Sequence, residues 1–161
     1  MSDVRVVNAS PLILLGKIER IELLLQLGPR LAVPEGVAEE LRAGSPSDAA
    51  RAWIEGPGSQ MIMPVERVDP LAASWDLGLG ESHVLTICRT LSGAEAIIDD
   101  RAARNCAAAL GIPVRGTVAL IVLAKRRSLI PQAKPVLQAL LDQGIHLDSA
   151  IVDAALRLAD E

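Results

Sequence analysis

Short aliphatic runs alternate with longer stretches of helical periodicity along this chain. Residues 4–7, 31–33, 96–98 and 113–115 have the pattern of buried strands. Residues 61–65 predict an edge strand at best, because Pro64 cannot donate a hydrogen bond within a sheet. Helices are predicted over residues 12–27 with an interruption near 17–20, and over 34–41, 49–55, 81–91, 101–110, 117–127, 131–143 and 148–159. Residues 56–59 predict a loop, and residues 66–80 give no clear pattern.

This alternation predicts an α/β fold, in which a mostly parallel sheet carries helices on both faces. We expect one domain over residues 1–161, because no repeat or interdomain linker interrupts the pattern. The helices from about residue 131 are expected to pack on that domain or to form an interface. Ser10 is expected to cap the first helix, with Pro11 at its first position, and Thr117 is expected to cap the helix that reaches Arg127.

Composition narrows the classes of function. Hydrophobic residues make up 50% of the chain, yet it has no Phe or Tyr, and its only aromatic side chains are Trp53 and Trp75. The core must therefore be aliphatic, and the composition argues against a nucleic-acid reader that stacks bases on aromatic rings. The net charge of -4 gives no general attraction to phosphate, so a nucleic-acid substrate would need a local basic patch or bridging metal ions.

Other features predict a cytoplasmic protein without a membrane segment. The first residues lack the basic stretch of a signal peptide, and no apolar run approaches the roughly 18 residues of a membrane span. Cys88 and Cys106 lie in apolar helical patterns and are expected to be buried, reduced thiols. His83 and His146 have no zinc-ligand spacing and are expected at the surface.

Polar residues directly follow two predicted strands, where open α/β sheets place their ligand sites. Asn8 follows the first strand, and Asp99 and Asp100 follow the strand at 96–98. Carboxylates placed there need neutralisation, by a metal or by the free N–H groups of a helix start. For Asp99 and Asp100 taken alone, helix capping is the favoured interpretation.

Helix geometry adds two more candidate acids. Glu81 lies on the otherwise apolar stripe 81, 84, 85, 88 and 91, so it turns toward the core side of its helix. A dipole-stabilised Glu at the helix start is an equally good interpretation of that position. In the helix at 34–41, Glu40 flanks the apolar face whereas Glu39 points away from it, so we expect Glu40 in the site and Glu39 in solvent.

Several convergent carboxylates would bind a hard cation such as Mg²⁺ or Mn²⁺ and support phosphodiester hydrolysis. Arg101 and Arg104, beside the acidic pair, are candidate phosphate contacts, as is Arg115. The alternative for Arg101 and Arg104 is pairing with local acids at the surface. The cations at 125–127 are better explained as complements to a helix C-terminus. A Gly-rich phosphate loop and the Ser/His/Asp and Cys/His patterns are absent from the sequence.

Taken in order, these features resemble the PIN-like domains, and most closely a subfamily related to toxins of bacterial and archaeal type II toxin–antitoxin pairs. The stretches that carry the resemblance are VVNASPLILLGKI at 6–18, VPEGVAEEL at 33–41, LGLGESHVLTI at 77–87 and IIDDRAARNCAAALGIPVRGTVALIVLAKRRSLIP at 97–131. The four together cover much of the chain and are specific, although each is weak alone.

The resemblance implies a three-layer α/β/α sandwich whose acidic pocket binds Mg²⁺ or Mn²⁺ and cuts single-stranded RNA. It places metal ligands at Glu40, Glu81 and Asp99, Asp100 or both, with Ser10 as a supporting polar residue. The family pattern usually has Asp at the end of the first strand. Asn8 stands there in this chain and keeps a carbonyl oxygen but loses a negative charge. The resemblance further implies an RNA substrate, a homodimer and a small antitoxin partner.

Three functional hypotheses follow. The leading one is a metal-dependent endoribonuclease of the toxin type, with Glu40, Glu81 and Asp99 or Asp100 holding the metal and Asn8 assisting. The second is a catalytically weakened PIN-like protein that binds RNA or another protein. The third, a phosphoacceptor receiver domain, is weaker because it requires acids where the chain has Asn8.

Overall fold

The computed structural model describes residues 3–28 and 30–161. Within this part of the chain, five parallel strands form one sheet in the order β3-β2-β1-β4-β5. The strands are β1 (Val4–Val7), β2 (Leu31–Pro34), β3 (Ile62–Met63), β4 (Ala94–Ile97) and β5 (Val114–Arg115). The sheet order changes direction at β1, whose carboxyl end lies between those of β2 and β4.

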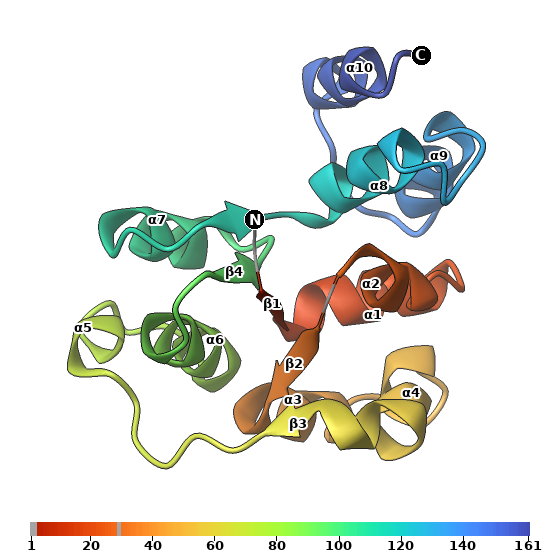
Figure 1. Cartoon of the computed structure of the whole chain (residues 1–161). Coiled ribbons are helices and arrows are strands. Elements are labelled where there is room, and N and C mark those ends of the chain that lie inside the picture. Colours follow the sequence, from red (N-terminus) through yellow and green to blue (C-terminus); the bar gives the residue numbers. More distant parts are fainter. Residues whose placement is uncertain (1–2, 29) are drawn as a thin grey trace.

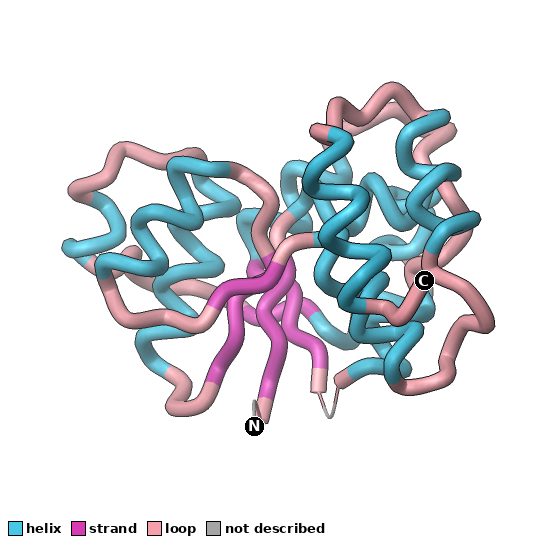
Figure 2. The backbone as a smooth tube through the Cα atoms, turned by 90° about the horizontal axis from the view of Figure 1, so that it is seen from above, coloured by secondary structure: helices cyan, strands magenta, loops and turns pink. Residues whose placement is uncertain are grey.

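Helices cover both faces of the sheet, so the three-layer α/β/α prediction is confirmed (Figures 1 and 2). In Figure 1, α5 and α6 lie on the left of the sheet, and α1, α2 and α8 lie on the right. The helices are α1 (Ala9–Lys17), α2 (Glu22–Leu27), α3 (Glu35–Arg42), α4 (Ala49–Glu55), α5 (Pro70–Ala73), α6 (Leu79–Thr90), α7 (Arg101–Ala109), α8 (Thr117–Arg126), α9 (Lys134–Asp142) and α10 (Ser149–Leu158), with a 3-10 helix at Pro57–Met61.

Several predicted boundaries were wrong. The fourth strand begins at Ala94, two residues before its predicted start. The charged Glu95 interrupts the apolar pattern in the sequence, but in the structure its carboxylate is buried against Arg5. The predicted loop at 56–59 lies largely in the 3-10 helix, and the stretch without a pattern at 66–80 contains α5 and the start of α6. The third strand spans only two residues, and its predicted position at the sheet edge is confirmed.

The start of the first helix was also predicted wrongly. Asn8 rather than Ser10 is its N-cap residue, the helix begins at Ala9, and Ser10 is an exposed second residue. Pro11 therefore occupies the third helical position, where its missing N–H has no intrahelical acceptor in any case. This shift places the Asn8 side chain at the end of β1.

The core is aliphatic, as the composition predicts, and Cys88 and Cys106 are buried free thiols. The C-terminal helices α9 and α10 both pack against α8. The carboxylate of Glu161 accepts hydrogen bonds from the backbone N–H groups of Ala133 and Lys134, which joins the end of the chain to the start of α9. In the part of the chain that the structure describes, no helix has the length and apolar character needed to cross a bilayer.

An ion-pair network lies inside the sheet. Arg5 of β1 and Glu95 of β4 are register partners, and their side chains are joined by a contact of 3.0 Å between Nε and Oε1. Arg115 of β5 contacts the same carboxylate with both Nε and Nη2 at 3.3 Å. Arg5 Nη1 also donates to the carbonyl of Leu27 at 2.6 Å, and Arg127 donates to that carbonyl as well. The network thus connects three strands to the end of α2.

Candidate active site

Asn8 leads from the carboxyl end of β1 into α1. Its backbone N–H donates to the carbonyl of Ile97 at 3.0 Å, which keeps it in register with the neighbouring strand β4. Its side chain is almost completely buried, with the residue 2% exposed. The amide Nδ2 lies 3.3 Å from Oε1 of Glu81, to which it donates. The amide oxygen Oδ1 is also buried but has no hydrogen-bond partner among the described residues.

The first turn of α6 brings two acids toward Asn8. Glu81 lies in this turn, and the backbone N–H of Gly80 donates to Oε1 of Glu40 at 2.9 Å. A Cβ atom placed on Gly80 would lie 2.6 Å from Glu40 Oε1 and 3.2 Å from Asn8 Oδ1. Both oxygens therefore face the same small space, which stays open because residue 80 has no side chain. The packing of α3 against α6 makes this approach of Glu40 and Gly80 possible.

The surroundings of Glu40 disfavour the ionised form of its carboxyl group. The pKa of Glu40 is raised above its ordinary value, first by loss of hydration and further by the negative charge of Glu81. The hydrogen bond from Gly80 and the charge of His83 act in the opposite direction but do not cancel the rise. A cation between these carboxylates would relieve both unfavourable effects. Glu40 and the neighbouring Glu39 are both exposed, and Glu40 in addition accepts the hydrogen bond from Gly80 of α6.

Asp99 is held by the first residue of α8, the helix that follows β5. Its Oδ1 accepts from the backbone N–H of Thr117 at 2.8 Å, and its Oδ2 accepts from the Thr117 hydroxyl at 2.6 Å. Thr117 is the first residue of α8, so its predicted role as the cap of that helix was wrong: its hydroxyl holds Asp99 instead. A Cβ on Gly116 would lie 3.0 Å from Asp99 Oδ1 and 2.7 Å from Arg104 Nη1, so carboxylate and guanidinium both crowd this glycine.

The other predicted site residues have different surroundings. Asp100 caps α7, because its Oδ2 accepts from the backbone N–H of Ala103 at 2.9 Å. Ser10 and Arg101 are exposed, and Arg104 is half-buried with Nη1 donating to the carbonyl of Ile98 at 3.3 Å. No group of three or more His, Cys, Asp or Glu side chains among residues 3–28 and 30–161 is arranged to hold a metal. Contacts through Asn8 and Gly80 join Asn8, Glu40 and Glu81 in one oxygen cluster, whereas Asp99 is bonded to Thr117.

His83 contradicts its predicted surface position, whereas His146 is exposed as expected. The Nδ1 atom of His83 accepts a hydrogen bond from the backbone N–H of Gly36 at 2.9 Å. A Cβ on Gly36 would lie only 2.7 Å from that nitrogen, so the contact requires glycine. Nearly all of α6 is buried, and its polar residues therefore need partners inside the protein. His83 thus joins α6 to the start of α3, the two helices that carry Glu81 and Glu40.

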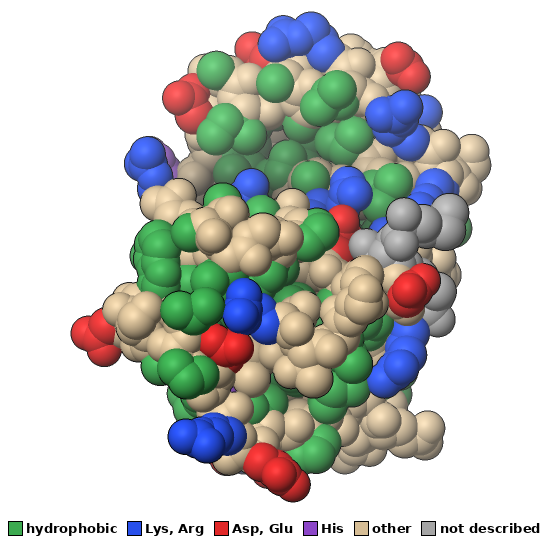
Figure 3. Space-filling view, turned by 60° about the vertical axis from the view of Figure 1, so that its left-hand side comes forward, with side chains coloured by type: hydrophobic (Ala, Val, Ile, Leu, Met, Phe, Trp, Pro, Cys, Tyr) green, Lys and Arg blue, Asp and Glu red, His purple; other side chains and the backbone are tan. Residues whose placement is uncertain are grey.

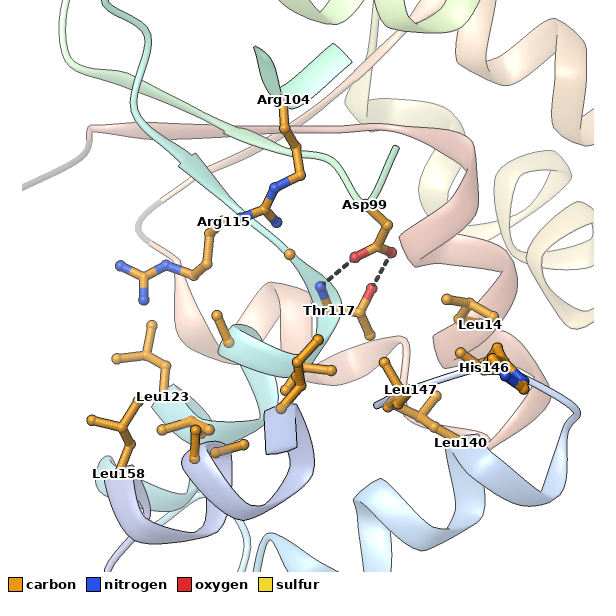
Figure 4. Close-up of a pocket in the computed structure, with 18 of the residues that line it drawn as sticks. Leu14, Asp99, Arg104, Arg115, Thr117, Leu123, Leu140, His146, Leu147 and Leu158 are labelled. Carbon is orange, nitrogen blue, oxygen red and sulfur yellow. Dashed lines mark hydrogen bonds between the residues drawn. The ribbon is translucent and has the colours of Figure 1, made fainter. Parts of the chain in front are cut away.

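A cavity of about 770 Å³ adjoins Asp99. We call it the α8–α10 groove; it is lined by Asp99, Thr117, four arginines (Arg101, Arg104, Arg115 and Arg126), His146 and the aliphatic side chains of Leu14, Val118, Val122, Leu123, Leu140, Ile145, Leu147, Ile151 and Leu158 among others. Figure 4 shows Arg104 and Arg115 on one side of the Asp99–Thr117 pair and Leu14 and Leu147 on the other. Figure 3 shows a hollow bordered by hydrophobic side chains in the upper part of the molecule, where α10 lies. The groove thus combines an aliphatic surface with positive charge.

Comparison with known proteins agrees with this geometry. The family model DUF3368, described as a PIN domain, matches residues 4–161. No curated protein matches the chain significantly. The match extends over β1, β2, β4 and β5 and the helices that carry Glu40, Glu81 and Asp99, and it includes the C-terminal helices. The chain therefore belongs to the PIN-domain family, whose members are in general nucleases.

Proposed function

We propose that this protein is a metal-dependent endoribonuclease that hydrolyses single-stranded RNA. The observation that carries the proposal is the buried Oδ1 of Asn8, which has no donor among the described residues and faces the same space as Glu40 Oε1. A buried acceptor without a partner costs about 1–3 kcal/mol, so a ligand that satisfies it is favoured. Amide and carboxylate oxygens are the donors that Mg²⁺ and Mn²⁺ prefer.

The residues present fit such a cation. Asn8, Glu40 and Glu81 would hold it, and Asp99 would serve from the neighbouring strand end. Bound there, the cation would supply Lewis-acid activation of water and neutralise charge on the scissile phosphate. Asp100 is the weaker candidate of the acidic pair, because its carboxylate already caps α7.

The chain's own side chains have distinct tasks in this proposal. Thr117 fixes both oxygens of Asp99, and Asn8 orients Glu81, so these carboxylates need little reorganisation when substrate arrives. Arg104 and Arg115 lie along the groove beside Asp99 and would contact the phosphates of an RNA strand. Arg101 would do so from the exposed start of α7. This local positive charge would compensate for the net charge of -4.

Cleavage of a mixed-sequence single-stranded RNA tests the proposal. We expect purified protein to cut this RNA with Mn²⁺ or Mg²⁺ and to lose activity in EDTA. The same sequence as duplex RNA and as single-stranded DNA provides matched substrates, and slower cutting is expected for both. Equal rates on DNA would contradict the RNA preference, and no cutting with either metal would contradict the nuclease function.

A second candidate function is a catalytically weakened PIN protein that binds RNA or a partner protein. Asn8 favours it, because the amide lowers the negative charge of the oxygen cluster to that of two carboxylates. The two functions separate in one experiment, since the second predicts retention of labelled RNA without cleavage in the presence of Mn²⁺. Saturable binding with uncut RNA would support the second function over the first.

We further propose the toxin role, with a homodimer and a small antitoxin encoded alongside. The α8–α10 groove supports this part, because an antitoxin helix with aliphatic and acidic side chains would match its aliphatic lining and arginines. Induced expression is expected to arrest bacterial growth, and co-expression of the neighbouring small protein should restore it. Unimpeded growth with intact protein in the cells would contradict the toxin role.

A further inference from the structure

Three exposed hydrophobic side chains come just before and at the start of α6, the helix that carries Glu81. Leu71 is 50% exposed, Trp75 is 41% exposed and Leu79 is 47% exposed. We call these three side chains the α6 patch. Single exposed apolar side chains are common on protein surfaces, but a group of them marks a surface that binds something. The α6 patch contains an indole ring, which offers a flat aromatic face.

The segment that carries Trp75 is fastened to α6 by several contacts. The backbone N–H of Asp69 donates to Oγ1 of Thr86 at 2.9 Å, and the Asp69 carboxylate contacts Nε of Arg89 at 3.0 Å. Ala72 is fully buried beneath α5, which packs against α6 (Figure 1). Thr86 and Arg89 lie in the C-terminal half of α6, and the chain runs from there back to the start of that helix. Trp75 therefore lies toward the end of α6 that carries the site.

The backbone around Trp75 forms a closed turn. Its N–H donates to the carbonyl of Ala72 at 3.2 Å, and the N–H of Asp76 donates to the carbonyl of Ala73 at 3.1 Å. Asp76 has a φ of 53°, a left-handed conformation that ends the helical path. The indole is thus presented from an ordered backbone, so a ligand that binds it has little chain ordering to offset.

The α6 patch borders the proposed metal site. The Glu81 carboxylate folds back toward Gly78, because a Cβ on that glycine would lie 2.5 Å from Glu81 Oε2. Trp75 precedes Gly78 by three residues, which span at most about 11 Å. Leu79 extends the patch to the start of α3, since a Cβ on Gly36 would lie 3.0 Å from Leu79 Cγ. A nucleotide next to the phosphate at the metal site would therefore come within reach of the indole.

We propose that Trp75 forms a stacking subsite for one unpaired base of the RNA, beside the scissile phosphate. This inference rests on the proposed function and adds to it a contact with a base. The composition argues against a reader with several aromatic rings, but one indole suffices for one base. Stacking also needs no positive charge, which suits a chain with a net charge of -4. A base inside a duplex is already stacked and paired, so the subsite would favour single strands.

Tryptophan fluorescence of the full chain tests the proposal without depending on activity. The probe is a short mixed-sequence single-stranded RNA, added in EDTA so that it is not cut. We expect this RNA to quench the emission saturably, because a base stacked on Trp75 contacts the fluorophore directly. A strand of the same length that lacks its bases has the same charge and should not quench. The other fluorophore, Trp53, is half-buried with its ring against Gly58 and should be unaffected.

Three variants separate stacking from a general apolar contact. Trp75→Leu keeps an apolar side chain without the ring, so it should abolish the quenching and weaken RNA binding by about tenfold. Trp75→Phe keeps an aromatic face and should retain most of the affinity. Leu25→Ala removes a side chain of α2 that is 40% exposed, and this matched control should bind RNA as wild type does. Anisotropy of the labelled RNA measures the affinities, and circular dichroism confirms that each variant is folded.

The outcomes distinguish this inference from the proposed function. Absence of quenching, with equal RNA affinity in wild type and Trp75→Leu, would overturn the inference, and metal-dependent cleavage by both would leave the nuclease function intact. Base-dependent quenching by an RNA that stays uncut in Mn²⁺ would support the inference and contradict the nuclease function. A wild-type dimer that dissociates in Trp75→Leu, without quenching by RNA, would assign the α6 patch to a second copy of the chain and overturn the inference.

Discussion

Glu40→Gln is expected to lower the rate of Mn²⁺-dependent RNA cleavage by more than about a hundredfold. Substituting a residue that only supports a metal ligand typically lowers metal affinity or activity by about 10- to 100-fold, and Glu40→Gln neutralises a ligand itself. Glutamine keeps an oxygen that can accept the hydrogen bond from Gly80, so the local contact survives. Initial rates on a labelled single-stranded RNA measure the effect, with Glu39→Gln as the control that should match wild type.

The same variant should not be less stable than wild type in EDTA. Because the folded-state pKa of Glu40 is raised, ionisation of this group opposes folding at neutral pH. Glu40→Gln removes that penalty, and its advantage should disappear as the pH falls below the ordinary glutamate pKa of 4.5. Loss of cleavage accompanied by a loss of stability would point to a structural role for Glu40 and against our assignment.

Glu95→Ala is expected to cost about 3–5 kcal/mol in the free energy of unfolding. It removes the partner carboxylate of Arg5 and leaves a buried guanidinium without an anion, which is much more costly than losing an exposed pair. Chemical denaturation at neutral pH measures the effect. Glu55→Ala, which breaks an exposed pair with Arg51, is the control and should cost less than about 1 kcal/mol.

A double variant separates the contribution of charge to stability from that of side-chain packing in the Arg5–Glu95 network. Arg5→Met combined with Glu95→Leu removes both charges and keeps apolar volume, so it should recover much of the stability that Glu95→Ala loses. A cost of Glu95→Ala below about 1 kcal/mol would show that the Leu27 carbonyl suffices to hold Arg5.

The sequence pattern predicted those parts of the site that depend on local geometry. A strand followed at once by a polar residue placed Asn8 and Asp99 at the carboxyl ends of neighbouring strands. Helix periodicity turned Glu81 inward, and the structure has it half-buried and in contact with Asn8. It also favoured Glu40 over Glu39 for the site: both are exposed, and Glu40 bonds to Gly80 of α6. These results follow from periods of two and 3.6 residues, which a single segment expresses by itself.

What the sequence did not reveal depends on contacts between distant segments. Glu95 is charged and breaks an apolar strand pattern, and its partner Arg5 lies 90 residues away. His83 is buried because α6 packs against α3, α5 and three strands at once, which no pattern within α6 expresses. The hydroxyl of Thr117 bonds to Asp99 rather than to its own helix, so a local capping rule predicted the wrong partner.

The roles of two glycines of the site also depend on contacts between distant segments. Gly80 admits the Glu40 carboxylate, and Gly36 admits the imidazole of His83 at distances that no side chain would allow. In the sequence both appear as ordinary glycines near predicted helix starts. Their requirement arises from the packing of α3 against α6, which determines how closely Glu40 approaches Asn8.

The most direct test of the metal site is anomalous diffraction from crystals of the protein soaked in Mn²⁺, measured at the manganese absorption edge. We predict one strong peak beside Asn8 Oδ1 and within ligand distance of the Glu40 and Glu81 carboxylates. Crystals of Glu40→Gln treated identically should show a weaker peak or none. Strong manganese density elsewhere in wild-type crystals, with none at these oxygens, would contradict a metal site formed by Asn8, Glu40 and Glu81.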